Sequence, residues 1–179
     1  MTEDEFNKNV LKFFQKKLEK TNLPIKVERN NYILRDFTFS RNKKGDWQLL
    51  CGTQEQDIIF YKDVIPRKDF LGKIGKTRGT GLRADLIIPI ALCELKVGSL
   101  NTHGMIVAGK IAQDVKSIFP HCISFFIVSS NIERRLGPET ALRQAKSFDG
   151  VYLEWEKEKE IIWQELLRHF KYCQERKVF

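Results

Sequence analysis

Paired cysteines are absent from this sequence. Its four cysteines stand alone at Cys51, Cys93, Cys122 and Cys173, with no CxxC pair and no Cys/His cluster. This spacing argues against a structural zinc site, whose ligands usually come in close pairs. The cysteines lie in apolar or amphipathic surroundings, so we expect reduced thiols in the protein core.

Long hydrophobic runs, repeats and nucleotide-binding loops are missing as well. No apolar run approaches the ~20 residues that a membrane helix needs, and no signal-peptide pattern is visible. Gly-Lys occurs twice, but without the G-x-x-x-x-G-K-[ST] pattern of a P-loop. With no internal repeat or low-complexity linker, we expect a single cytoplasmic domain over residues 1–179 that does not associate with membranes.

Acidic residues are fewer than basic ones. The chain has 31 Lys+Arg against 23 Asp+Glu, which gives a net charge of +8 and a pI near 9.3. This balance suits a polyanionic partner. Many basic proteins bind no nucleic acid, so the charge gains weight only beside a site for phosphodiester chemistry.

The segment from Arg83 to Gly98 reads R-A-D-L-I-I-P-I-A-L-C-E-L-K-V-G, with its charges at the ends of a dense apolar run. Such runs form strands buried on both faces, where ionised groups are costly unless compensated. Side chains alternate along a strand, so Glu94 and Lys96 point to the same side. If the chain reverses around Pro89, Asp85 lies across from Glu94, about 5 Å away. Pro-Ile is not a favoured two-residue turn, which leaves a wider loop, a bulge or an offset register open.

Two neighbouring carboxylates repel each other unless a cation lies between them. Mg²⁺ prefers oxygen ligands and is commonly held by one or two carboxylates together with waters and phosphate oxygens of a substrate. A lysine two residues after the second carboxylate can stabilise phosphate charge or help to deprotonate a water. The pattern therefore indicates metal-assisted phosphodiester hydrolysis, and a structural salt bridge is the alternative.

This stretch resembles the PD-(D/E)xK nuclease superfamily, with Asp85, eight intervening residues and then Glu94-Leu95-Lys96. The resemblance implies a restriction-endonuclease-like fold in which Asp85 and Glu94 bind Mg²⁺, for which Mn²⁺ can substitute. It also implies that Lys96 acts on the attacking water and the scissile phosphate. Ala84 stands where the family name has proline, which is a tolerated variation.

Two further features of the superfamily point to candidates elsewhere in the chain. The helix after the ExK strand often presents a Gln, Lys or Arg toward the active site, which implies Gln113 and Lys110. An acidic residue of the first helix joins the metal site in some members, and the candidates for that role are Glu3, Glu5 and Glu19. For each of these side chains, an exposed position without a catalytic role is the alternative.

The remaining pattern predicts an α/β fold. Thr2 to Glu5 forms a capping box, and the apolar residues that follow have helical spacing. The expected elements are a helix over 3–20, a hairpin over 31–51, a strand over 57–62, strands on both sides of Pro89, a helix from 101 or 102 to 119, a strand over 122–128, and a C-terminal helical part over 138–176 with an extended segment at 150–155. We therefore expect a mixed central sheet with flanking helices and an αβββαβ core over about residues 57–130.

A glycine-rich, basic loop spans Pro66 to Arg83. Small residues let the backbone approach a phosphate closely, and cations attract it. The residues expected to bind nucleic acid here are Lys73, Lys76, Arg78 and Arg83, with Lys110 beyond them. A merely flexible loop is the alternative. The hairpin at 31–51 either extends the catalytic sheet or forms a wing for DNA contacts or dimerisation.

The sequence predicts a Mg²⁺-dependent DNA endonuclease, of the restriction type by first choice. One active site cuts one strand at a time, so symmetric cutting of double-stranded DNA implies a homodimer. Junction-resolving, repair and transposon-associated nucleases share the fold and stay open. A catalytically silent nucleic-acid-binding module is the alternative from another class.

Overall fold

The computed structural model describes residues 1–66, 77–78, 85–97, 102–129, 143 and 145–178. Its elements are α1 (Glu3–Leu18), β1 (Lys26–Arg41), β2 (Trp47–Ile65), β3 (Thr77–Arg78), β4 (Leu86–Lys96), α3 (Thr102–Ile118), β5 (Ile123–Val128), β6 (Gly150–Tyr152) and α5 (Trp155–Glu175). Within these residues no helix is both long and apolar enough to cross a membrane.

The strands form one mixed sheet of six, in the order β3-β2-β1-β4-β5-β6, with a further pairing of β2 to β4. Strands β1, β2 and β4 follow one another antiparallel, and β4 then pairs in parallel with β5 through the crossover helix α3. A parallel pair requires such a crossover connection. The predicted α/β class, with a mixed central sheet, flanking helices and the αβββαβ order, is confirmed.

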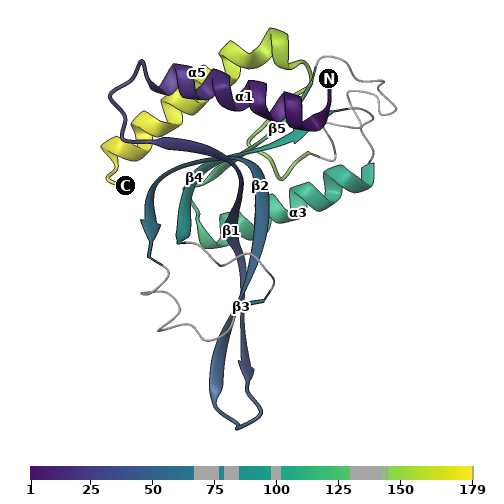
Figure 1. Ribbon diagram of the computed structural model, residues 1–179, viewed down its shortest axis with the longest axis vertical. Helices are drawn as coiled ribbons and strands as arrows, with labels where there is room; N and C mark the ends of the chain where they lie inside the picture. The colour runs from purple at the N-terminus through teal and green to yellow at the C-terminus, as the bar shows by residue number, and fades with distance from the viewer. Residues whose placement is uncertain (67–76, 79–84, 98–101, 130–142, 144, 179) are drawn as a thin grey trace.

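Helices cover both faces of this sheet (Figure 1). α1 and α5 lie side by side on one face, where Phe14, Phe60, Trp155 and Phe170 are among the residues of the largest hydrophobic cluster. α3 covers the other face, where its Val115 packs with sheet residues of a second cluster. Burial of this apolar area is the main source of stability, and all four cysteines are buried and unpaired, as expected.

The predicted capping box at the start of α1 is present. The backbone N–H of Thr2 donates to Glu5 Oε2 at 2.7 Å, and the N–H of Glu5 donates to Thr2 Oγ1 at 3.3 Å. We expect Thr2→Ala to lower the free energy of unfolding by about 1 kcal/mol, because backbone donors of the first turn lose their partner. Urea denaturation measures this effect, with Lys12→Ala, on the exposed side of the same helix, for comparison. An unchanged midpoint for Thr2→Ala would contradict it.

The predicted chain reversal at Pro89 is wrong. β4 runs without a turn from Leu86 to Lys96, and the register with β2 shifts where Tyr61 pairs with Pro89 and Phe60 pairs with Ala91. Ile90 is therefore an extra residue in the strand. Proline lacks a backbone N–H and is tolerated within a sheet at such irregularities, so Pro89 marks a bulge in one long strand.

The predicted hairpin over 31–51 is the outer part of a longer one. β1 and β2 pair from Lys26 with Tyr61 to Arg41 with Trp47, so the separate strand expected at 57–62 is the second half of β2. The far part of this hairpin projects well away from the rest of the sheet (Figure 1). The C-terminal part agrees with the prediction in β6 and α5, and the helical segment expected from Pro138 lies mostly outside the described residues.

Candidate active site

Asp57 and Glu94 lie on neighbouring strands, at the end of the ladder between β2 and β4. Ile58 pairs with Cys93 in this ladder, so Asp57 and Glu94 occupy the next position of the same antiparallel register. Residues directly opposite in such a pair have Cβ atoms roughly 5 Å apart. The Asp57 carboxylate is also fixed to the facing strand, because its Oδ2 accepts a hydrogen bond from the backbone N–H of Leu95 at 2.7 Å.

Two side chains from the first turns of α1, those of Glu3 and Asn7, lie next to Lys96 and Asp57. Glu3 Oε1 lies 3.6 Å from the ammonium Nζ of Lys96. Asn7, four residues later and therefore on the same side of the helix, donates from Nδ2 to Asp57 Oδ1 at 3.2 Å. The side chains of Lys96 and Glu3 are 38% and 57% exposed, so the arrangement can be reached from solvent.

Both strand carboxylates have raised pKa values. The pKa of Glu94 rises to about 7, mainly because burial disfavours the charged form and further because Asp57 is negative, while Lys96 opposes the shift. Burial also raises the pKa of Asp57, and the negative charge of Glu3 adds to it, against the hydrogen bonds from Leu95 and Asn7. The site is therefore short of positive charge, and a bound cation would favour the ionised form of both groups.

The donor set suits a hard cation. Asp57 and Glu94 offer carboxylate oxygens from adjacent strands. Asn7 is 5% exposed, and its Oδ1 accepts no hydrogen bond, which leaves an unsatisfied oxygen acceptor on the residue that holds Asp57. Among the described residues no group of three or more His, Cys, Asp or Glu is placed to hold a metal. Mg²⁺ commonly needs only one or two carboxylates, with water and phosphate oxygens completing its shell, so these residues fit it.

The structure brings Glu94 and Lys96 together and places Asp85 elsewhere. Asp85 precedes the first residue of β4, while Glu94 lies near its last. Glu94 follows Asp85 by nine positions of extended strand, a span on the order of 30 Å. Asp85 is exposed at that far end, so the position that sequence analysis gave to Asp85 belongs to Asp57.

Of the three acids considered in the first helix, only Glu3 pairs with Lys96. Glu5 is used in the capping box, and Glu19 caps the other end of α1. Sequence analysis therefore missed Asp57 and Asn7 and left Glu3 undecided. The signal for Asp57 is present in the sequence, since this acid directly precedes the apolar run Ile58-Ile59-Phe60.

The two α3 residues that sequence analysis named make no hydrogen bond or ion pair with Asp57 or Glu94. Gln113 is exposed, and its side chain makes no hydrogen bond to another described residue. Lys110 forms an ion pair with Asp114 at 2.7 Å, to which Arg35 also donates at 3.3 Å. Of the loop cations, Lys73, Lys76 and Arg83 lie outside the described residues, and the backbone of Arg78 pairs with Gly52 in the sheet.

The sequence matches no protein-family model and no curated protein. Among solved structures, a chain of the native A2B2 tetramer of BbvCI is similar to this chain. The two superpose with a TM-score of 0.46 at 14% identity, over 70% of this chain and 44% of that chain. This chain thus spans less than half of the BbvCI chain, and a likeness at this level assigns no activity.

Proposed function

We propose that this protein is a Mg²⁺-dependent DNA endonuclease. The observation that carries the proposal is the meeting of Asp57 and Glu94 across β2 and β4, with Lys96 two residues further along β4. In the proposed site Asp57 and Glu94 would hold the ion. When bound, Mg²⁺ supplies Lewis-acid stabilisation of phosphate charge and lowers the pKa of a bound water.

The chain's own residues orient the reaction. The Leu95 N–H and the Asn7 amide hold the two oxygens of Asp57 in fixed directions, so little reorganisation is needed when substrate arrives. The Lys96 ammonium places a positive charge beside the carboxylates, where it stabilises the scissile phosphate and orients the attacking water. Glu3 keeps this ammonium near the site until the phosphate replaces it.

The proposed substrate is double-stranded DNA. The net charge of +8 attracts a polyanion, and the half-exposed Lys96 lets a backbone phosphate approach. One such site hydrolyses one strand, so cutting both strands of a symmetric sequence requires two copies related by a two-fold axis. A restriction-type homodimer is the finer form of the proposal.

The activity is tested with supercoiled plasmid in Mg²⁺, in Mn²⁺ and in EDTA. We expect metal-dependent nicking or linearisation by the wild type, and a rate at least about 100-fold lower for Lys96→Met, which keeps the length of the side chain but removes its charge. Lys12→Met on the exposed side of α1 is the matched control and should cut like the wild type.

Cutting that persists in EDTA, or that Lys96→Met leaves unchanged, would contradict the proposal. DNA binding without cutting in either metal, on plasmid, linear and branched substrates, would instead identify a catalytically silent DNA-binding module.

A further inference from the structure

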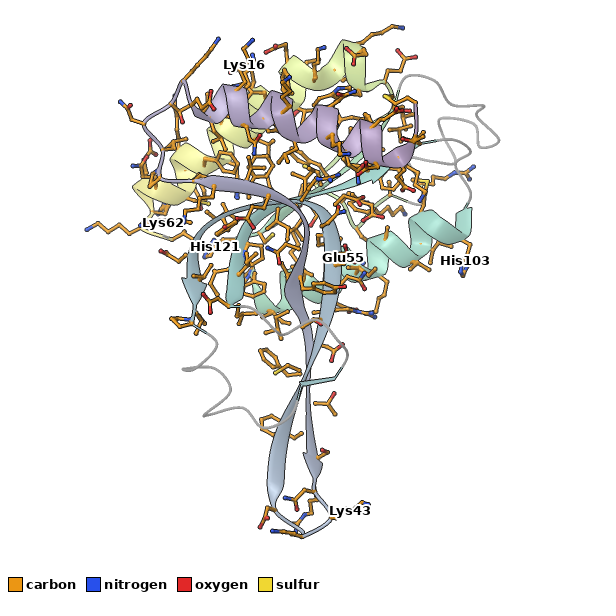
Figure 2. All side chains as sticks on the ribbon, in the orientation of Figure 1. Lys16, Lys43, Glu55, Lys62, His103 and His121 are labelled. Atoms are coloured by element: carbon orange, nitrogen blue, oxygen red, sulfur yellow. The ribbon has the colours of Figure 1, made fainter. Side chains whose placement is uncertain are left out.

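The outer part of the β1–β2 hairpin, residues 37–50, forms an arm that projects from the body of the molecule (Figure 1). Figure 2 shows Lys43 at its far end and Glu55 where β2 enters the body. β2 is one continuous strand, so the strand that forms the arm also carries Asp57. Trp47 precedes Asp57 by ten positions of extended strand, a span of roughly 33 Å, which sets the reach of the arm from the proposed active site.

The tip of the arm is held by its own hydrogen bonds. Asn42 Oδ1 accepts from the backbone N–H groups of Lys44 and Asp46 at 2.8 and 3.0 Å, and Asn42 Nδ2 donates to the Asp46 carboxylate at 3.1 Å. Gly45 provides the positive φ of +85° that closes the turn. The one acid of the tip is therefore engaged, while Lys43 and Lys44 are exposed and form no ion pair with a described residue.

The arm also exposes aromatic side chains. Phe37 and Phe39 are two residues apart and share one face of the ribbon, and their exposures are 45% and 72%. An isolated two-stranded ribbon is only marginally stable in water. Exposed aromatic area and unpaired cations on one arm are a combination that nucleic-acid-binding surfaces use, since cations contact phosphates and rings contact bases.

We propose that this arm binds the DNA duplex beside the cleavage site, with Lys43 and Lys44 on backbone phosphates and Phe37 and Phe39 against base edges. The inference rests on the proposed endonuclease function, and it identifies the part of the protein that holds the DNA. A two-stranded ribbon fits the major groove, which is about 12 Å wide. A second copy of the chain is the less suitable occupant, because it carries the same charge of +8 and repels a positively charged tip.

Binding is measured in the Glu94→Gln background, so that no strand is cut, as the fluorescence anisotropy of a labelled duplex over a series of salt concentrations. Adding Lys43→Ala and Lys44→Ala is expected to weaken binding about tenfold and to reduce the slope of log K against log salt by about 2, one unit for each lost phosphate contact. Lys16→Ala with Lys20→Ala removes the same charge from the exposed side of α1, where Figure 2 shows Lys16 far from the arm. This control should change the slope by less than half as much.

An equal salt dependence of DNA binding for the Lys43→Ala, Lys44→Ala variant and its Glu94→Gln parent would overturn the proposed role of the arm. This holds even if the plasmid assay shows that the protein is an endonuclease. If the Lys43→Ala and Lys44→Ala variant has the smaller salt slope but the wild type cuts no DNA, the arm is a DNA contact and only the proposed endonuclease activity is refuted. Sedimentation of Phe37→Ser with Phe39→Ser adds a second readout: a dimer that this variant dissociates, at unchanged DNA affinity, would show that the arm joins two copies instead. Circular dichroism confirms that each variant is folded.

Discussion

Asp57→Asn is expected to reduce Mg²⁺-dependent DNA cleavage by about 10²–10³-fold, whereas Asp85→Asn retains wild-type activity. The two substitutions are chemically identical and differ only in position. Asp57 faces Glu94 across the β2–β4 ladder, while Asp85 lies at the opposite end of β4. Initial rates of plasmid nicking, measured with each variant at saturating Mg²⁺, give the comparison.

The result that would refute this assignment is the reverse order, with activity lost in Asp85→Asn and kept in Asp57→Asn. Both variants need a thermal unfolding scan, since the Asp57 carboxylate also accepts hydrogen bonds from Leu95 and Asn7. Asparagine keeps an oxygen acceptor for only one of these two donors, so a loss of activity counts as chemical rather than structural only if the melting temperature is unchanged.

Glu94→Gln is expected to stabilise the metal-free protein above pH 7. The pKa of Glu94 rises from an ordinary value of 4.5 to about 7 in the folded state, so the folded protein holds a proton that the unfolded chain has released. Stability from this group is complete below pH 4.5 and is lost as the pH rises to about 7. The loss is roughly 1–3 kcal/mol, equivalent to a melting temperature lower by about 3–10 °C.

Melting temperatures in EDTA, measured from pH 5 to pH 8, test the sign of this effect. The wild type should lose stability across this interval, and Glu94→Gln should lose less, with Asp57 supplying the remaining slope through its own raised pKa. Mg²⁺ should then raise the melting temperature of the wild type at pH 8 and leave Glu94→Gln nearly unchanged. Glu19→Gln at the exposed end of α1 is the matched control. A wild-type stability that rises with pH while Glu94→Gln follows the same curve would refute the role of Glu94.

Local sequence pattern was sufficient to place part of the candidate site. Glu94 and Lys96 were recognised because a strand places residues two apart on one side, and the structure keeps them on β4. The partner carboxylate was misplaced because proline near the middle of an apolar run reads as a turn. A bulge accommodates Pro89 instead, and a bulge depends on the neighbouring strand, which local sequence does not specify.

Asp57 was missed for a related reason. It precedes Glu94 by 37 positions, and only the pairing of β2 with β4 brings the two together. Long-range strand pairing depends on the whole sheet, whereas hydrophobic periodicity reports only the faces of each strand. The class of fold was nevertheless predicted correctly. The order of helices and strands along the chain stays the same even though the two strands predicted on either side of Pro89 form the single strand β4.

The exposed side chains of the arm could not be inferred from pattern. Phe37 and Phe39 alternate with polar residues as in a half-buried strand, yet both remain largely exposed. Periodicity indicates that one face of a strand is apolar, but it does not indicate whether the fold supplies anything to cover that face.

Burial of all four cysteines has a practical use in spectroscopy. Burial raises the pKa of the Cys93 and Cys122 thiols, and thiolates rather than thiols react with maleimides. A Lys43→Cys substitution would therefore place the sole reactive thiol at the far end of the hairpin without removal of native cysteines. A fluorophore attached there would report energy transfer to a dye at a chosen duplex position, so the orientation of bound DNA could be mapped in solution.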